Sequence, residues 1–352
     1  MSDVYAVIMA GGRGARFWPR SRRTLPKQCL SVDGGPTLIQ QTVSRLASLV
    51  PPQRVLVITG PDMAPAIRAQ LPSVPPENIL IEPQGRNTAP CVGLGAVEVG
   101  RRGGPDAVFL CLPADHIVAA PDVLLSALQT AVSAARREHA LVTLGITPTR
   151  PETGFGYLEL GERVAGAAEV YRVARFREKP DAASAQAYLE SGRYLWNAGM
   201  FVFAVSDILS AFAEHLPRSA AALARIAASP STLASEWGEL EATSIDYGIM
   251  ERSRRILTVP CDPGWSDVGS WSAAAALMPE QRGHRVLSDV LVDIDAEECV
   301  VYAPGKAVAL VGVEGLVVID AEDAILVMSR ERSQDVREVV RQLEADGLDR
   351  FT

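Results

Sequence analysis

The chain has 352 residues, of which 48% are hydrophobic, and its formal net charge is −8 at pH 7. This acidic balance gives no electrostatic basis for binding a nucleic acid polymer, and the apolar content suffices for two packed domains. The five cysteines form no CxxC pair and the four histidines show no metal-binding spacing, so we expect reduced thiols in a cytoplasmic protein. We find no secretory signal pattern and no apolar run of about 18 residues that would cross a membrane.

The first 146 residues alternate short apolar runs with helical patterns. Apolar residues recur at helical spacing over 37–50 and 123–137. Strand–helix alternation with fully apolar strands predicts an α/β fold with a mostly parallel sheet that helices cover on both faces. The runs rich in β-branched residues predict strands at 4–10, 54–60, 78–83, 107–113 and 140–146.

Polar stretches follow three of these strands: "GGRGAR" after the first, "EPQGRNTAP" after the third and "PADH" after the fourth. In parallel sheets, ligands bind at the carboxyl ends of the strands. We therefore expect these stretches to form one binding site.

The pattern changes along the rest of the chain. Residues 150–275 mix strands and helices, whereas 286–328 predict about five short strands with no helix between them. A final helix is expected to start at Ser333, because apolar residues recur at helical spacing after it. We interpret 1–275 as the domain that carries the site and 286–352 as a small β-rich domain.

The glycine-rich loop predicts an anion site. Gly11, Gly12 and Gly14 let backbone amides approach a phosphate closely, and Arg13, Arg16 and Lys27 supply positive charge. A dinucleotide-binding loop is disfavoured because Phe17 takes the third glycine position of GxGxxG, and no P-loop sequence occurs. The alternative is a tight turn with solvated arginines.

Two aspartates lie in unusual settings, and no nucleophile constellation accompanies them. We favour Asp115 as a Mg²⁺ ligand, because this ion takes one or two carboxylates together with phosphate oxygens. An acid–base pair of Asp115 and His116 is the weaker interpretation. Asp267 lies between two tryptophans and two glycines in "GWSDVGSW", where the alternative is a helix cap or turn aspartate.

Several motifs together resemble the mannose-1-phosphate guanylyltransferase family, also called GDP-mannose pyrophosphorylases. The resemblance covers residues 4–345, and the FWPxSRxxxPKQ form of the loop is specific to it. Ala15 and Arg20 depart from the usual family pattern, which has Thr or Ser and a smaller or apolar residue there. The motifs, in chain order, are "AGGRGARFWPRSRRTLPKQ", "EPQGRNTAP", "LPADH", "FGYLE", "REKPD", "WNAGMFVF" and "WSDVGSW".

The resemblance implies a Rossmann-like nucleotidyltransferase core followed by a short left-handed β-helix-like domain. It implies transfer of GMP from GTP to mannose 1-phosphate, with Mg²⁺ as cofactor. As a separate hypothesis, the β-rich domain packs on the catalytic domain or on a second subunit, which would give a homodimer. The expected catalytic residues are Arg16, Lys27, Asp115 and Asp267, and the last two are the expected metal ligands. The expected nucleotide contacts are Gly11, Gly12, Arg13, Gly14, Glu82, Asn87 and Thr88. The expected sugar contacts are Gly156, Tyr157, Glu178, Lys179 and Asn197.

Each motif has a structural alternative, and two other functions stay open. "EPQGRNT" also fits a capped helix start with Asn87 or Thr88 as the cap, and "EKP" fits a solvated charge pair before a turn. Trp265 and Trp271 are expected in the core. The alternative functions are a nucleotidyltransferase for another sugar or base, such as glucose 1-phosphate or ATP, and a non-catalytic regulatory subunit that binds sugar nucleotide.

Overall fold

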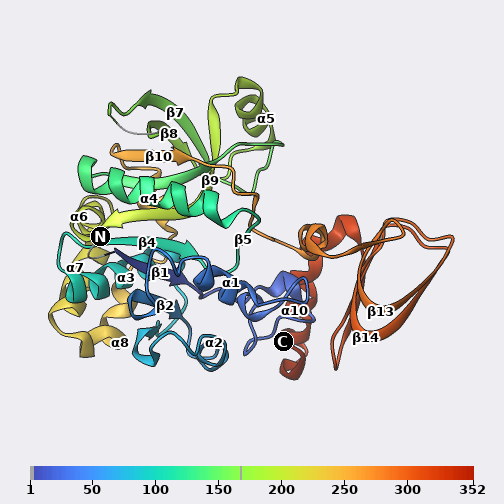
Figure 1. Ribbon diagram of the computed structural model, residues 1–352. Coiled ribbons are helices and arrows are strands. Elements are labelled where there is room, and N and C mark those ends of the chain that lie inside the picture. The colour runs from blue at the N-terminus through green and yellow to red at the C-terminus, as the bar shows by residue number, and fades with distance from the viewer. Residues whose placement is uncertain (1–3, 167–168) are drawn as a thin grey trace.

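A nine-stranded sheet, in the order β3-β2-β1-β4-β9-β6-β10-β8-β7, forms the centre of the larger part of the molecule (Figure 1). The structure is a computed structural model that describes residues 4–166 and 169–352. The strands are β1 (Val4–Met9), β2 (Val55–Thr59), β3 (Ile79–Ile81), β4 (Val108–Pro113), β6 (Leu141–Ile146), β7 (Tyr157–Arg163), β8 (Tyr171–Arg177), β9 (Tyr194–Ala204) and β10 (Ile256–Pro260).

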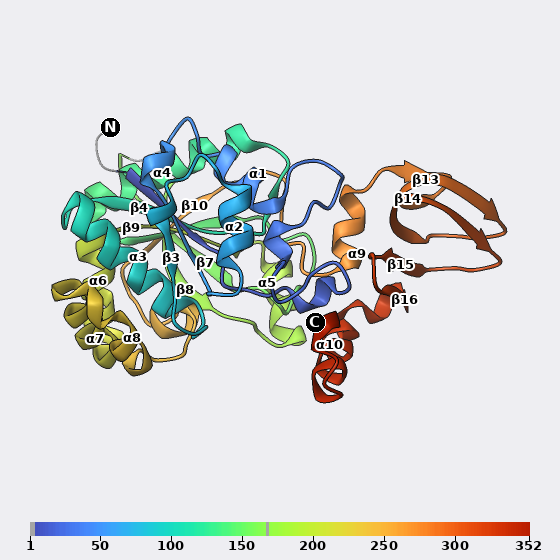
Figure 2. The ribbon, with the colours of Figure 1, turned by 90° about the horizontal axis from the view of Figure 1, so that it is seen from below.

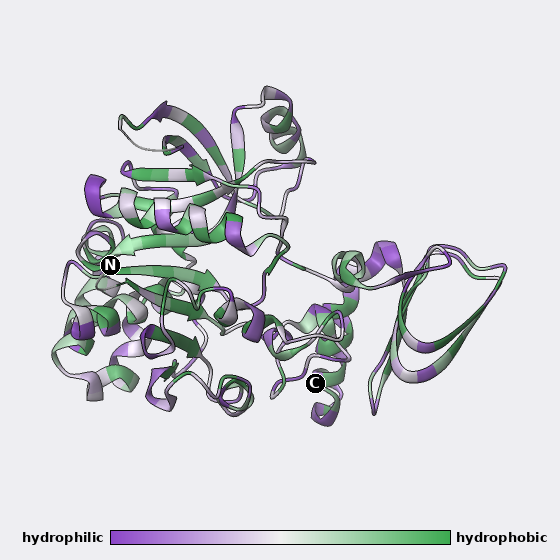
Figure 3. Cartoon of the chain, viewed as in Figure 1, coloured by the Kyte–Doolittle hydropathy of each residue, from purple (hydrophilic) through white to green (hydrophobic). Residues whose placement is uncertain are grey.

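The sheet is parallel on one side and mixed on the other. Strands β1 to β4 pair in parallel, and so do β6 and β10. The long strand β9 lies antiparallel between β4 and β6. All five strands expected in the first 146 residues are confirmed within two residues at either end. The central strands are hydrophobic along their length, as a sheet buried on both faces requires (Figure 3).

Helices cover both faces of this sheet, as the alternation predicts (Figures 1 and 2). Ala6 and Ile8 of β1 face α1, α2 and α4, whereas Val7 faces α3, α6 and α7. The helices are α1 (Leu38–Ser44), α2 (Ala64–Gln70), α3 (Thr88–Gly103), α4 (Pro121–Glu138), α5 (Ala182–Ser191), α6 (Val205–His215), α7 (Pro217–Ala228), α8 (Leu233–Glu236), α9 (Trp271–Ala274) and α10 (Val336–Ala345). Within the described residues, none of the helices combines the length and apolarity needed to span a bilayer.

The C-terminal strands are fewer and longer than expected. Over 286–328 there are four strands instead of five, and β13 and β14 have 11 and 12 residues. Pro304 and Gly305 do not end β14 but lie at a shift of register, after which the pairing with β13 resumes at Val290 and Ala307. The Gly305 amide donates to Asp289 Oδ1 at 2.9 Å within this irregularity. The sheet consists of β12 (Glu280–Gln281), β13 (His284–Ile294), β14 (Val300–Val311), β15 (Leu316–Asp320) and β16 (Ile325–Ser329).

The final helix begins later than expected. Residues Arg330–Asp335 form 3₁₀ turns in which Ser333 is buried, and α10 starts at Val336. Because Ser333 lies inside these turns, it cannot serve as the helix cap. The apolar face of α10 is confirmed, since Val336 is buried and Val339, Val340 and Leu343 pack against the same hydrophobic cluster.

A third hydrophobic core joins the two ends of the chain. Phe17, Trp18 and Leu30 from the loop after β1 pack in one cluster with Trp271, and with Tyr302 and other residues of β14 to β16. Trp271 is 1% exposed, which confirms its expected core position. The β-rich part therefore packs directly on the segment that carries the glycine loop (Figure 2).

Candidate functional site

The glycine loop follows the carboxyl end of β1, and side-chain hydrogen bonds to the Ala10 oxygen hold its first residue. Ala10 O accepts hydrogen bonds from Gln28 Nε2 at 2.7 Å and from Thr59 Oγ1 at 3.0 Å. Gly14 has φ +69°, and a Cβ there would lie 2.2 Å from Lys27 Cβ. Only glycine fits this position. Gly11, Gly12 and Arg13 are exposed, so the loop presents its backbone to solvent.

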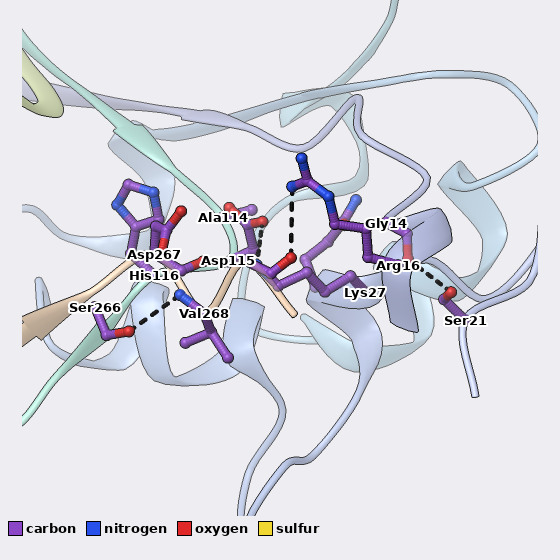
Figure 4. A network of polar contacts seen from close by, with 12 residues as sticks. Gly14, Arg16, Ser21, Lys27, Ala114, Asp115, His116, Ser266, Asp267 and Val268 are labelled. Carbon is purple, nitrogen blue, oxygen red and sulfur yellow. Dashed lines mark hydrogen bonds and ion pairs between the residues drawn. The ribbon is translucent and has the colours of Figure 1, made fainter. Parts of the chain in front are cut away.

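Lys27 connects its own loop with two segments that lie far from it in the sequence, one at Asp115 and one at Asp267. Its Nζ lies 2.7 Å from Asp115 Oδ2 and donates to the backbone oxygen of Asp267 at 2.8 Å (Figure 4). The side chain is only 5% exposed, in a short 3₁₀ segment, Lys27–Cys29. Asp115 follows β4, and Asp267 follows β11 (Trp265–Ser266), which pairs with β5 (Ile117–Val118). The predicted catalytic lysine and both aspartates thus lie together in one site.

The two carboxylates differ in their electrostatic environment. Burial would raise the pKa of Asp115, but the Lys27 ammonium and His116 outweigh it, and the pKa lies below its ordinary value. Burial raises the pKa of Asp267, and the nearby Asp115 carboxylate adds to that effect while Lys27 opposes it. Positive charge added between these carboxylates is therefore stabilised most strongly when both are ionised.

The carboxylates supply part of a metal shell. Among residues 4–166 and 169–352, no group of three or more His, Cys, Asp or Glu side chains is arranged to hold a metal ion. Mg²⁺ keeps several water ligands and uses one or two carboxylates with substrate phosphates. Asp115 and Asp267 fit this incomplete, phosphate-completed donor set.

The loop arginines face the C-terminal part of the chain. Arg13 forms an ion pair with Glu344 at 3.3 Å, and Arg16 donates to the backbone oxygen of Gly269 at 3.4 Å. Burial lowers the pKa of Arg16, whose Nε is buried without a hydrogen-bond partner among the described residues. Arg20 stacks on the Tyr302 ring at 4.8 Å. The arginine at this position thus contacts β14.

Glu82 lies directly beneath the glycine loop. A Cβ at Gly11 would stand 2.7 Å from Glu82 Oε1, so the carboxyl group reaches the loop backbone. Burial raises the pKa of Glu82 to about 7. Asn87 caps α3 by accepting from the Thr88 amide at 2.9 Å, and Thr88 Oγ1 accepts from the Ile245 amide at 2.9 Å. The helix-cap interpretation of Asn87 is therefore confirmed, whereas its nucleotide contact stays a prediction.

Gly156, Glu178 and Asn197 lie together on one face of the sheet. The backbone N–H of Asn197 donates to Gly156 O at 2.8 Å, and a Cβ at Gly156 would lie 2.5 Å from Glu178 Oε2. Lys179 Nζ lies 2.9 Å from Glu178 Oε1. The predicted sugar contacts at these positions thus form one cluster.

The side chain of Tyr157 lies elsewhere. Tyr157 pairs directly with Trp196, the neighbour of Asn197, so its side chain is on the opposite face of the sheet from Asn197. Its ring is fully buried against Tyr188 of α5, with ring centroids 5.3 Å apart. Only the backbone of Tyr157 faces the cluster, because side chains alternate along a strand.

Other residues support the site without having been predicted there. Trp265 Nε1 donates to His116 Nδ1 at 3.1 Å, and burial lowers the pKa of His116 to about 4. His116 is therefore neutral at pH 7, which disfavours the acid–base pair with Asp115. Gln28, which is buried, and Asp246, which is half-buried, are further polar partners. Gln28 stands inside the "PKQ" motif, but no sequence signal marks Asp246.

A glycine loop, a buried lysine and two aspartates at the ends of the strands of an α/β sheet define a nucleotidyltransferase. Residues 5–282 match the family model of the nucleotidyl transferases, and 289–343 match that of the MannoseP isomerase/GMP-like beta-helix domain. The chain belongs to the mannose-1-phosphate guanylyltransferase family. The expected core and its β-helix-like C-terminal domain are thereby confirmed.

The relatives and solved structures agree with this assignment. The mannose-1-phosphate guanylyltransferases of Klebsiella pneumoniae and Escherichia coli are 40% and 41% identical over 96% of this chain and 73% of their own length. A Thermus thermophilus crystal structure, described as a "mannose-1-phosphate geranyltransferase", is 40% identical with a TM-score of 0.88, over 97% of this chain and 99% of that one. A UDP-glucose pyrophosphorylase complexed with UDP-glucose, 16% identical over 79% of this chain and 97% of that one, shares the fold with a TM-score of 0.53.

Proposed function

We propose that the chain transfers GMP from GTP to α-D-mannose 1-phosphate, giving GDP-mannose and pyrophosphate. The observation that carries the proposal is the bridge of Lys27 to Asp115 and to the Asp267 backbone beside the glycine loop. The family of the chain and the names of its relatives support the choice of mannose 1-phosphate and GTP.

An oxygen of the sugar phosphate attacks the α-phosphorus of GTP in line with the departing pyrophosphate. The second pKa of a phosphate monoester is about 6, so this nucleophile is mostly ionised at pH 7 and needs no general base. The neutral His116 agrees with that chemistry. The work of the protein is to bring two polyanions together and to stabilise charge on the leaving group.

The loop backbone, the cationic side chains and the two aspartates have separate parts in this reaction. The backbone at Gly11, Gly12 and Gly14 admits the phosphates closely. Arg13, Arg16 and Lys27 neutralise their charge, and we assign Arg16 and Lys27 the larger share because both are more buried than Arg13. Asp115 and Asp267 would hold Mg²⁺, which neutralises phosphate oxygens when bound and so favours attack on phosphorus.

The remaining contacts select the substrates. Glu82 would accept hydrogen bonds from guanine N1–H and N2–H, a donor pattern that adenine lacks, with Asn87 and Thr88 at the nucleoside. Gly156, Glu178, Lys179 and Asn197 would contact the mannose unit and its phosphate, together with the backbone of Tyr157. We also propose a cytoplasmic location and the domain ranges 1–275 and 286–352, of which residues 1–3 and 167–168 lie outside the described part.

We further propose a homodimer that uses the β-rich domain. Its strands carry apolar side chains that are about half exposed or more, which is unusual for a surface that stays free in water. A mass that equals one chain in light scattering at micromolar concentration would contradict this assembly. These side chains are Val290, Val292, Ile294, Val311, Ile325 and Val327.

The test of the reaction is pyrophosphate release with Mg²⁺, crossing mannose 1-phosphate and glucose 1-phosphate with GTP, ATP, UTP and dTTP. We expect release with mannose 1-phosphate and GTP to exceed every other pair. A preference for another pair would retain the mechanism and reject the assigned sugar or base. Folded protein that is silent with every pair would support a regulatory subunit instead.

A further inference from the structure

Asp246 opens a π-helical turn, Asp246–Met250, between α8 and β10. Such turns are rare and occur frequently at functional sites. This turn places the Asp246 carboxylate against β9, within the cluster of Gly156, Glu178 and Asn197. None of the motifs that identify the family contains this aspartate.

The hydrogen bonds of Asn197 fix Asp246 in place. Asn197 Oδ1 accepts from the Thr143 hydroxyl at 2.8 Å and from the Gly199 amide at 3.2 Å. Its Nδ2 donates to Asp246 Oδ1 at 2.8 Å. Because two donors occupy the amide oxygen, the orientation of the amide is determined, and one of its two N–H groups is used to hold Asp246. Asn197 thus orients the Asp246 carboxylate.

Glu178 provides a second carboxylate beside the first. Its Oε1 pairs with Lys179, but its Oε2 is buried without a hydrogen-bond partner in the described part of the chain, although Glu178 is only 7% exposed. Burial and the neighbouring Glu178 raise the pKa of Asp246 to about 7. The two carboxylates thus have more acceptor positions than Lys179 and Asn197 fill, and Glu178 Oε2 is the one left open.

A hexose supplies the missing donors. Each hydroxyl carries one O–H, and adjacent hydroxyls on a sugar ring reach a carboxylate pair from one side. Hydrogen bonds to an ionised acceptor are roughly twice as strong as neutral ones. A site built to accept from hydroxyls rejects an analogue that lacks one, because a buried acceptor is then left unpaired.

We propose that Asp246 is a sugar-binding and specificity-determining residue, which accepts a hydrogen bond from a hexose hydroxyl beside Glu178 and is held in position by Asn197. This assignment rests on the proposed function, because it takes a hexose 1-phosphate as the substrate. Lys179 lies at the edge of the same pair, where its ammonium is placed for the phosphate of that substrate.

The test is the isosteric variant Asp246→Asn, in which Asn197 still finds an acceptor oxygen. Asp262→Asn, an exposed aspartate before β11, is the matched control. We expect KM for mannose 1-phosphate to rise at least about tenfold in Asp246→Asn, with kcat and KM for GTP within about twofold of the parent. The Asp262→Asn control should match the parent in all three constants.

A second readout separates substrate contact from structural support. The parent chain should prefer mannose 1-phosphate over its monodeoxy analogues, and Asp246→Asn should lose the preference against one of them. An unchanged KM and an unchanged preference in a variant with parental circular dichroism would overturn the assignment. If the parent favours another sugar 1-phosphate, the proposed substrate is wrong. The role of Asp246 is then tested by the same comparison with that sugar. If no pair is turned over, calorimetric binding of mannose 1-phosphate decides, and equal Kd values for parent and variant would overturn the assignment.

Discussion

The indole Nε1 of Trp18 donates a hydrogen bond to the backbone oxygen of Phe351 at 2.7 Å, which ties the loop after β1 to the penultimate residue. The Arg23 amide also donates to Thr352 O, at 3.2 Å. With the third core and the Arg13–Glu344 pair, these bonds make the end of the chain part of the support of the glycine loop.

We predict that Trp18→Phe and removal of residues 350–352 both lower the free energy of unfolding by removing the hydrogen bond from Trp18 to Phe351. Each change removes one partner, and a hydrogen bond contributes about 1 kcal/mol to the free energy of unfolding. A double-mutant cycle by urea unfolding should therefore show a coupling energy of about 1 kcal/mol. Strictly additive effects would contradict the link.

Gly14→Ala and Gly12→Ala should separate stability from nucleotide binding. Gly14 has a left-handed backbone and contacts Lys27, so alanine there should cost at least about 1–2 kcal/mol of unfolding free energy. A Cβ at Gly12 meets no atom within 4 Å, so Gly12→Ala should unfold within about 0.5 kcal/mol of the parent. Its KM for GTP should rise, because the methyl group takes the space through which a phosphate approaches the loop.

Urea unfolding and steady-state kinetics of both glycine variants check this pair. Equal stability of the two variants would show that the contact of Gly14 with Lys27 relaxes at no cost. An unchanged KM in Gly12→Ala would remove Gly12 from the nucleotide site.

Lys27→Met should lower kcat/KM for pyrophosphate release at least about tenfold, since a charge-assisted contact contributes about 1.5–3 kcal/mol. Lys27→Arg should not restore the activity. The lysine is enclosed between Asp115, the Asp267 backbone and Gly14, and a planar guanidinium does not replace a compact ammonium there. Recovery of most of the parental rate in Lys27→Arg, with both variants folded by circular dichroism, would refute this tight fit.

Glu82 should make the protein less stable as the pH rises. Burial raises the pKa of its carboxyl group from 4.5 to about 7 in the folded chain. Its favourable contribution to the free energy of unfolding is therefore complete below pH 4.5 and is lost as the pH rises from 4.5 to about 7. The free energy of unfolding of Glu82→Gln, minus that of the parent, should therefore increase by up to about 3 kcal/mol over this interval. Urea unfolding at several pH values measures the difference, and a flat difference would place an ionised Glu82 in the folded chain.

The sequence predicts the part of the site in which neighbouring strands end at one edge. The apolar runs give β1, β3 and β4 directly, and the polar stretches after them lie close together because the strands are parallel. The family resemblance places Lys27 and Asp115 in one site, but their direct contact is a finding of the structure. The part played by the Asp267 backbone oxygen is not predicted either, because nothing in the residue type distinguishes a backbone contact from a side-chain contact.

Other features depend on packing that the sequence pattern does not encode. The motif "FGYLE" does not reveal that the Tyr157 ring lies on the far face, because that depends on the register with β9. Asp246 lies in a π-helical turn that has no simple periodicity. β14 continues through Pro304 and Gly305 by a shift of register against β13, which turn propensity alone does not predict.

The shared third core has a consequence for the order in which the chain folds during synthesis. Residues 17–30 leave the ribosome early, but their partners in β14 to β16 and α10 follow only on the order of tens of seconds later, at about 5–20 residues per second. Until then Phe17, Trp18 and Leu30 lack the partners that bury them. The nascent chain should therefore show chaperone binding and protease cleavage between Arg20 and Arg23 that disappear only after β14 to β16 and α10 have emerged, when the central sheet has already formed.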